Sequence, residues 1–416
     1  MSGFDKFKRV NPMSDKIECL AFHHMEYYAG DATSTYKRFL GALGAELAAK
    51  SDLSTGNDSH ASYLVETGTC RMVFTAPYSS VDQEKAQKLP FPFFSSSQAS
   101  ALFAKHGLHV HAVGITVKDV QATFDIMVAN GGIVVQEPTR VVDANPERGF
   151  ADIAEIKLYG DVSLRLIDAT NFKGSFLPNF EDVKVADEKY ALGKYGIERI
   201  DHIVGNVHDL QATLKYIKNM TGFHDFAEFT SEDVGTVDSG LNSAVLANNN
   251  EMILFPVNEP TFGTRRKSQI QTYLEQNQGE GVQHVALMTH DIYRTMDLMT
   301  EATPWGGFEF MPGQAHDYYE RVKVKLGAEN PFSEEQLAKI EKLGILIDKD
   351  DQGILMQIFT KPIGDRPTIF FEIIQRVGCI NATTKIQKPG CGGFGKGNFK
   401  DLFKSIEDYE SNLRIN

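Results

Sequence analysis

The chain has 416 residues, with 42% hydrophobic and 23% charged side chains, so we expect a large buried core and two or more domains. Its formal net charge of −13 and the lack of a long basic run exclude a nucleic-acid partner, because phosphate binding requires clustered Lys and Arg. No apolar stretch approaches the roughly 18 residues of a membrane helix, and the first 16 residues lack the apolar core of a secretory signal, so we predict a cytoplasmic protein without a membrane partner.

Two similar units follow one another in the first half of the chain. In the first unit, a strand-like run at 22–26 precedes a helical stretch that starts at Asp31. In the second unit, a strand at 112–115 leads to Asp119 and a helical run, and a further strand follows at 160–166. Apolar runs separated by Gly and Asn turns predict several more strands in each unit.

The second half repeats this order. A strand at 200–204 precedes a helical stretch that starts at Asp209, and a strand at 282–287 leads to Asp291 and another helical run. A final strand covers 367–376. The chain therefore contains four related units, two in each half, and each unit is a strand, a helix and then several strands.

The two halves meet in a segment between Asp182 and Gly196 that is dense in Glu, Asp, Lys and Gly. We therefore predict domains of residues 1–190 and 191–416. A charged, helical insertion is expected at 315–350, with one helix starting at Ser333. The tail at 398–413 follows a glycine-rich segment and has apolar residues at helical spacing, so it forms either a lid or a terminal helix packed on the core.

Three polar residues stand inside apolar, strand-like runs of the second half: His202, His284 and Glu372. A buried carboxylate is costly unless it is paired or holds a metal ion. His284 follows His202 by 82 residues and precedes Glu372 by 88, about one unit each, so matching strands bring the three together. Two histidines and one carboxylate suggest a non-haem iron site.

Each of these residues also has a purely structural interpretation. A lone histidine on a strand is more often part of the core than a ligand. Glu372 could instead form a salt bridge with Arg366 or Arg376. Arg376 lies four residues along the same strand, about 13 Å away, which disfavours that pair.

The first half does not repeat the ligand set. His24 matches the first ligand position, Ala112 the second and Arg165 the third. His111 is one residue out of step, and a one-residue slip on a strand turns the side chain to the opposite face. A one-residue difference in the turn before Asp119 would remove the slip and put His111 at the second position. Because arginine is not a ligand of this kind, we predict that the first half is a structural copy without a metal ion.

The neighbours of Glu372 indicate the shape of a pocket. Phe370 lies two residues before Glu372 and shares its face, and Gln357 and Phe359 share a face on the expected hairpin partner. Inward glutamine and phenylalanine beside a metal suit an aromatic substrate with a polar group, although each phenylalanine alone is more often core.

Cysteine usage gives a separate expectation. Cys19, Cys70, Cys379 and Cys391 form no Cys-x-x-Cys pair, so we expect four free thiols in a reducing compartment.

Several longer motifs carry a family resemblance. They are DHIVGN at 201–206, SGLNSAVL at 239–246, PVNEP at 256–260, KSQIQTY at 267–273, VQHVAL at 282–287, LMQIFTKP at 355–362, DRPTIFFEIIQRV at 365–377 and GGFGKGNF at 392–399. With these motifs the chain resembles the 4-hydroxyphenylpyruvate dioxygenases, and the plant-type members most closely. The resemblance implies the α+β vicinal oxygen chelate fold, with two domains that are each an open barrel of two βαβββ units, and a C-terminal helix.

The resemblance also implies a set of site residues. Fe(II) would be held by His202, His284 and Glu372. Hydrogen-bonding residues around the substrate would be Ser243, Asn258, Gln269, Gln283 and Gln357. Phenylalanines of the pocket would be Phe359, Phe370, Phe394 and Phe399, with Asn398 on the closing tail. Within this set Phe359 and Phe399 are the candidates for sandwiching the ring. Gln283 is the exception to our geometry, because beside His284 on a strand it should face away.

The implied reaction converts 4-hydroxyphenylpyruvate and O2 to homogentisate and CO2, in tyrosine catabolism, and the implied assembly is a homodimer. Two alternatives are 4-hydroxymandelate synthase, which shares ligands, substrate and cofactor, and a metal-free binding protein of the same fold.

Overall fold

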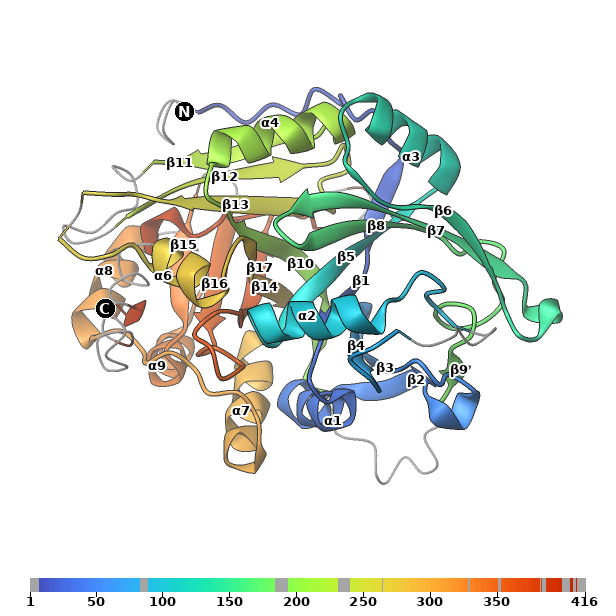
Figure 1. Ribbon diagram of the computed structural model, residues 1–416. Coiled ribbons are helices and arrows are strands. Elements are labelled where there is room, and N and C mark those ends of the chain that lie inside the picture. Colours follow the sequence, from blue (N-terminus) through green and yellow to red (C-terminus); the bar gives the residue numbers. More distant parts are fainter. Residues whose placement is uncertain are drawn as a thin grey trace.

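The structure, a computed structural model, consists of two curled sheets with helices packed on them (Figure 1). It describes residues 7–82, 89–183, 194–230, 240–263, 265–327, 330–350, 353–381, 383, 387–398, 405–406 and 409. The predicted boundary between residues 190 and 191 lies outside the described residues. Among the helices of the described ranges, none is long and apolar enough to span a bilayer.

The first half forms a nine-stranded sheet in the order β6-β7-β8-β5-β1-β4-β3-β2-β9. Its strands are β1 (Cys19–Tyr28), β2 (Glu46–Ser51), β3 (His60–Thr67), β4 (Cys70–Pro77), β5 (His109–Val117), β6 (Val134–Val142), β7 (Phe150–Tyr159), β8 (Val162–Asp168) and β9 (Glu181–Asp182). Its helices are α1 (Ala32–Leu43), α2 (Ser96–His106) and α3 (Val120–Ala129).

The second half forms an eight-stranded sheet in the order β11-β12-β13-β10-β14-β17-β16-β15. Its strands are β10 (Ile197–Asn206), β11 (His224–Phe229), β12 (Leu241–Ala247), β13 (Leu254–Pro260), β14 (Gly281–Thr289), β15 (Leu346–Lys349), β16 (Gly353–Phe359) and β17 (Phe370–Gly378). Its helices include α4 (Leu210–Thr221), α6 (Gln269–Gln276), α7 (Ile292–Ala302), α8 (His316–Leu326) and α9 (Glu334–Leu343).

The strand pairing confirms four βαβββ units, two in each half. In every unit the first and last strands are parallel neighbours, as in β1 with β4 and β14 with β17. The two units of a half meet through their first strands, which are antiparallel: β1 with β5, and β10 with β14. The predicted α+β fold of two open barrels is therefore confirmed.

An aspartate begins the first helix of each unit. The side chains of Asp31, Asp119, Asp209 and Asp291 each accept a hydrogen bond from the backbone N–H three residues ahead, at 2.6–3.0 Å. A helix leaves its first N–H groups without partners, and an aspartate cap satisfies one of them. The recurrence of the same cap explains why the repeat is readable in the sequence.

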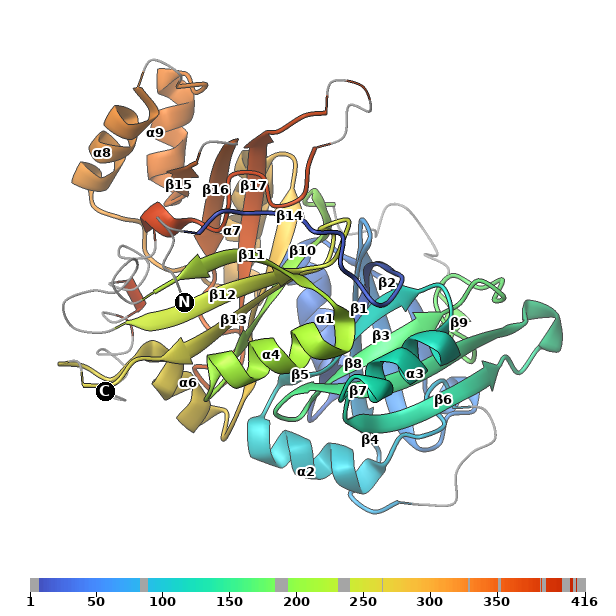
Figure 2. The same cartoon turned by 90° about the horizontal axis from the view of Figure 1, so that it is seen from above.

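The predicted insertion is present as α8 and α9, which stand beyond the edge strand β15 (Figure 2). Ser333 caps α9 and forms a capping box with Gln336. After the glycine-rich segment, the short turn Lys396–Asn398 is described, and Ser405, Ile406 and Tyr409 are helical.

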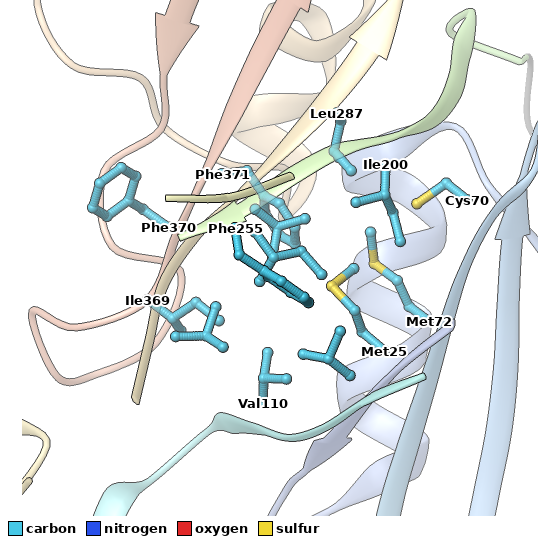
Figure 3. Close-up of a cluster of buried hydrophobic side chains, with 14 of the residues drawn as sticks. Met25, Cys70, Met72, Val110, Ile200, Phe255, Leu287, Ile369, Phe370 and Phe371 are labelled. Atoms are coloured by element: carbon cyan, nitrogen blue, oxygen red, sulfur yellow. The ribbon is translucent and has the colours of Figure 1, made fainter. Parts of the chain in front are cut away.

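A continuous hydrophobic core joins the two barrels. Met25, Met72 and Val110 of the first barrel belong to the same buried cluster as Phe255 and Phe371 of the second (Figure 3). The shared core fixes one barrel against the other.

The N-terminal segment crosses from the first barrel to the second (Figure 2). Asn11 Nδ2 donates to the carbonyl of Asn249 at 2.8 Å, and the Lys16 N–H donates to the carbonyl of Thr221 at 2.8 Å. Arg9 also pairs with Glu251. Residues 9–16, which we assigned by sequence to the first domain, therefore lie against the second barrel.

The expectation of four free thiols is wrong for one pair. Cys379 and Cys391 form a disulfide with a Cα–Cα distance of 5.9 Å, whereas Cys19 and Cys70 are free and buried. The bond forms because the chain turns back after β17 and brings residue 391 beside the end of that strand. A spacing of 12 residues without a recognisable motif does not reveal such a turn.

Candidate active site

Three adjacent strands bring the predicted ligands together inside the second barrel. His202 on β10 and Glu372 on β17 both pair in register with Ala286 of β14, two residues beyond His284. One ligand atom from each lies within 4.8 Å of the others. His202 Nε2 is 3.1 Å from Glu372 Oε2, and His284 Nε2 is 3.5 Å from the same oxygen.

Each histidine is oriented by the residue that precedes it. Asp201 Oδ2 lies 2.9 Å from His202 Nδ1, and Gln283 Oε1 lies 2.9 Å from His284 Nδ1. Such acceptors orient each ring so that Nε2 faces Glu372, and with a metal ion bound at Nε2 they would hold the ring proton on Nδ1.

These neighbours share a face with the ligands because both strands contain a bulge. On β10 the register shifts between Ile200 and His202, which leaves Asp201 as the extra residue. On β14 the partners of Val204 and Gly205 are His284 and Val282, which leaves Gln283 as the extra residue. A bulge interrupts the alternation of faces. Our expectation that Gln283 faces away from the site is therefore wrong.

The charges of the three groups suit a metal site. Burial raises the pKa of Glu372, but hydrogen bonds with the two histidines outweigh it and lower the pKa to about 2. Burial lowers the pKa of His284. The pKa of His202 is raised, because its hydrogen bonds with Asp201 and Glu372 outweigh the effect of burial. Two imidazole nitrogens and an ionised carboxylate form a donor set that could hold a divalent transition metal with open positions.

The alternative salt-bridge partners of Glu372 are engaged elsewhere. Arg376 forms a bidentate pair with buried Asp201, at 2.8 and 3.1 Å. Arg366 donates to the backbone carbonyls of Ala104 and Gln276. Arg376 holds the pKa of the Asp201 carboxyl well below its usual range, although burial alone would raise that pKa. Asp201 is therefore ionised beside His202.

A cavity opens beside the candidate ligands, and its empty volume of about 660 Å³ includes space open to solvent. The cavity brings together eight further residues of the predicted set: Ser243, Asn258, Gln269, Gln283, Gln357, Phe359, Phe370 and Phe394. It thus combines amide and hydroxyl groups with aromatic rings beside the candidate metal ligands.

The aromatic rings of the cavity also pack on the ligand histidines. Phe370 stacks on His284 with ring centroids 4.9 Å apart, and Phe394 meets His202 edge-on at 5.0 Å. Phe359 is edge-on to His284 at 6.0 Å. These contacts fix the imidazole planes and keep water from that side of the centre.

The polar side of the cavity is a connected amide group. Asn258 Nδ2 donates to Asn206 Oδ1 at 3.1 Å and to Gln283 Oε1 at 3.5 Å. Since Gln283 also contacts His284, this group links the polar wall to a candidate ligand.

Two predicted residues are not seen at the cavity. Asn398 is buried, but its Oδ1 accepts a hydrogen bond from Tyr318 Oη of α8 at 2.7 Å. Phe399 lies outside the described residues. Ile406 of the tail lines the cavity and belongs to the main core cluster. The lid and the packed-helix interpretations of the tail both stay predictions.

The sequence alone did not identify some functional neighbours. Ile406, Phe229 and Leu241 line the cavity, and helical or strand spacing shows that such residues are buried without showing what they face. Asp201 and Arg376 had a detectable signal, because each is a charged residue in an apolar strand and needs a partner.

Comparison with known proteins places this geometry in a family. The model of the Glyoxalase/Bleomycin resistance protein/Dioxygenase superfamily matches residues 21–152, within the first barrel. A triple mutant of 4-hydroxymandelate synthase from Streptomyces coelicolor has the same fold, with a TM-score of 0.76 at 20% identity over 95% of this chain and 100% of that chain.

Curated relatives are much more similar in sequence. The 4-hydroxyphenylpyruvate dioxygenase of Daucus carota is 53% identical over 99% of this chain and 92% of its own length. The enzyme of the same name from Arabidopsis thaliana is 52% identical, again over 99% of this chain and 92% of its own length. The chain therefore belongs to the 4-hydroxyphenylpyruvate dioxygenase family of enzymes.

Proposed function

We propose that this protein is an Fe(II)-dependent dioxygenase that converts 4-hydroxyphenylpyruvate and O2 to homogentisate and CO2 in tyrosine catabolism. The observation that carries the proposal is the convergence of His202, His284 and Glu372 on a cavity with an amide-rich side and an aromatic side. Two relatives that match 99% of this chain bear the name of this activity.

The proposed ligands are His202, His284 and Glu372, whose imidazole nitrogens and ionised carboxylate fit Fe(II). Bound Fe(II) would supply open coordination positions for the 2-oxo acid group and for O2. The atoms balance without an added reductant, because the substrate loses its carboxyl carbon as CO2 and both oxygen atoms of O2 remain in the products.

The protein residues would bind and orient the substrate. We assign the aromatic ring to the space beside Phe359 and Phe370, with Phe394 excluding water on the side of His202. Ser243, Asn258, Gln269, Gln283 and Gln357 would hydrogen-bond its polar groups. The predicted roles of Phe399 as a ring partner and of Asn398 on the closing tail stay predictions.

Product identification tests the function. Purified protein loaded with Fe(II) should consume O2 and release CO2 with 4-hydroxyphenylpyruvate, and chromatography with mass analysis should identify homogentisate. Glu372→Ala should bind little iron and form no product. Formation of 4-hydroxymandelate would support the synthase alternative, and a protein that binds no iron would support the binding-protein alternative.

We also propose, from the family resemblance, a homodimer in the cytoplasm. Light scattering of the purified protein should give twice the mass of one chain, 46.3 kDa. A fluorescent fusion of the full chain should distribute through the cytoplasm, and its accumulation in an organelle would contradict the location.

A further inference from the structure

One buried arginine makes contacts in two directions beside the candidate metal centre. Arg376, on β17, is fully buried, and its Nε and Nη2 donate to the two carboxylate oxygens of Asp201 at 3.1 and 2.8 Å. Its Nη1 donates to the carbonyls of Cys391 and Gly393, at 2.6 and 2.7 Å. A guanidinium can span these acceptors because its N–H groups diverge in a rigid plane.

In one direction the contacts lead to a candidate ligand. Asp201 Oδ2 accepts from Arg376 and also lies 2.9 Å from His202 Nδ1. The bidentate guanidinium therefore holds the carboxylate in its orientation toward the imidazole. Outer partners of this kind affect metal affinity about 10–100-fold.

In the other direction the contacts lead to the cavity wall. The two carbonyls belong to a glycine-rich segment that continues into Phe394 and Gly395, both of which line the cavity. Gly392 has φ +75 and leaves no room for a side chain, since a Cβ there would lie 2.6 Å from the backbone of Ile354. Gly395 has φ +74 and lies against the amide of Gln357. The segment is thus folded tightly over β16 with its carbonyls turned toward Arg376.

The two directions meet again at Phe394. Its ring lies 5.0 Å from the ring of His202 and 5.6 Å from the guanidinium carbon of Arg376. The contacts form a closed circuit from Arg376 through Asp201, His202 and Phe394, and back through the carbonyl of Gly393.

We propose that Arg376 is a positioning residue that couples metal binding at His202 to the closed arrangement of residues 391–395. The inference rests on the metal site of the proposed function. It predicts that metal affinity and the order of this segment change together, because one guanidinium fixes both.

The test uses Co(II) alone as the probe and does not depend on turnover. Arg376→Lys keeps the charge, but an ammonium group cannot span the carboxylate and two carbonyls. The Co(II) dissociation constant, measured by chelator competition, should rise by about tenfold or more. Hydrogen exchange should become faster at the amides of Gly393 and Asn398, which donate to the carbonyls of Gly390 and Gly395.

Arg199→Lys is the matched control. Arg199 also reaches Asp201 Oδ1, at 3.2 Å, but it is partly exposed and its other hydrogen bond goes to the carbonyl of Ile200. The Arg199→Lys variant should change the Co(II) dissociation constant by no more than about twofold, and the amides of Gly393 and Asn398 should stay protected from hydrogen exchange. Peptides from β5 provide an internal reference for global stability.

Wild-type protein offers a second test that needs no variant. If the coupling is real it is reciprocal, so saturating Co(II) should slow exchange at Gly393 and Asn398. The proposal is overturned if Arg376→Lys retains wild-type values in either readout, or if Co(II) leaves the exchange of the segment unchanged. By contrast, wild-type protein that binds Co(II) with the expected coupling but forms no homogentisate would refute the proposed function alone.

Discussion

The two barrels have the same strand arrangement but side chains of opposite charge at the centre. Strand register makes His24 the counterpart of His202, and Arg165 the counterpart of Glu372. The second barrel presents candidate ligands for a cation. The first barrel contains a cation of its own, the guanidinium of Arg165. Arg165 Nη1 lies 3.1 Å from His24 Nε2, the nitrogen that corresponds to the atom of His202 that faces Glu372.

The surroundings of the two centres differ at matching positions. Arg165 pairs at 2.6 Å with Glu26 and at 2.6 Å with Glu155, and all three side chains are buried. The register matches Glu26 to Val204 and Glu155 to Phe359, both of which line the cavity of the second barrel. Carboxylates that neutralise a fixed cation in the first barrel thus stand where the second barrel has apolar residues that line its cavity. A buried ion cluster fills one barrel, and the other is left free for chemistry.

The largest expected effect breaks the second centre. Glu372→Gln removes its carboxylate charge, so Co(II) affinity should fall by more than about 100-fold, beyond the loss typical of outer partners. Chelator competition measures it, and turnover should be lost as well. Arg165→Met, at the matching position of the first barrel, is the control and should leave Co(II) affinity unchanged. Equal losses in both variants would contradict the comparison.

Acid should destabilise the first barrel. Burial lowers the pKa of His23, His60 and His109 from 6.5 to about 3. Below pH 6.5 these histidines bind protons in the unfolded chain but not in the folded chain. Their contribution to the free energy of unfolding is therefore complete above pH 6.5 and is lost as the pH drops toward 3. The slope is about 1.4 kcal/mol per pH unit for each histidine. Urea unfolding at pH 7, 6 and 5 measures this slope.

His60→Phe provides the control for the acid prediction. Within the described part of the chain, the ring nitrogens of His60 have no hydrogen-bond partner, and its ring centroid is 4.0 Å from that of Phe94. The variant should take up one proton fewer on unfolding in acid, so the slope of its stability against pH should be smaller. An unchanged slope would show that His60 titrates normally.

Removal of the buried guanidinium of Arg165 should lower the free energy of unfolding by less than acid does. Arg165→Met leaves Glu26 and Glu155 buried without their counter-ion, which should lower the free energy of unfolding by about 3–5 kcal/mol. Denaturant titration followed by circular dichroism measures this change. Glu26→Gln in the same chain should recover part of the loss, and a loss below about 1 kcal/mol would mean that the ion cluster does not support the first barrel.

The smallest expected effect concerns the disulfide of the second barrel. Cys379→Ser with Cys391→Ser opens a short loop, so the stability should fall by about 3 kcal/mol or less. Dithiothreitol on the wild-type chain should lower the thermal midpoint in the same way and leave the double variant unaffected. A wild-type midpoint that does not respond to dithiothreitol would indicate that the thiols are not joined.

The repeat made much of this molecule predictable. Four Asp caps mark the helices, and the strand positions of the candidate ligands, His202 in the third unit and His284 and Glu372 in the fourth, could be matched across the repeat, as could the position of Arg165. The bulges at Asp201 and Gln283 were not predictable, because alternation assumes that no residue is inserted in the strand. Arg376 was weighed only against Glu372 on its own strand, whereas its partner Asp201 lies 175 positions away in the sequence.

The N-terminal segment on the second barrel has a consequence for the order of folding. Residues emerge from the ribosome from the N-terminus onward, so Arg9 and Asn11 must wait for Asn249 and Glu251, more than 230 positions later. Closing so long a loop is entropically costly and delays contacts of this kind. The first barrel therefore completes its sheet with a loose leading end, and docking of that end belongs to the last steps of maturation.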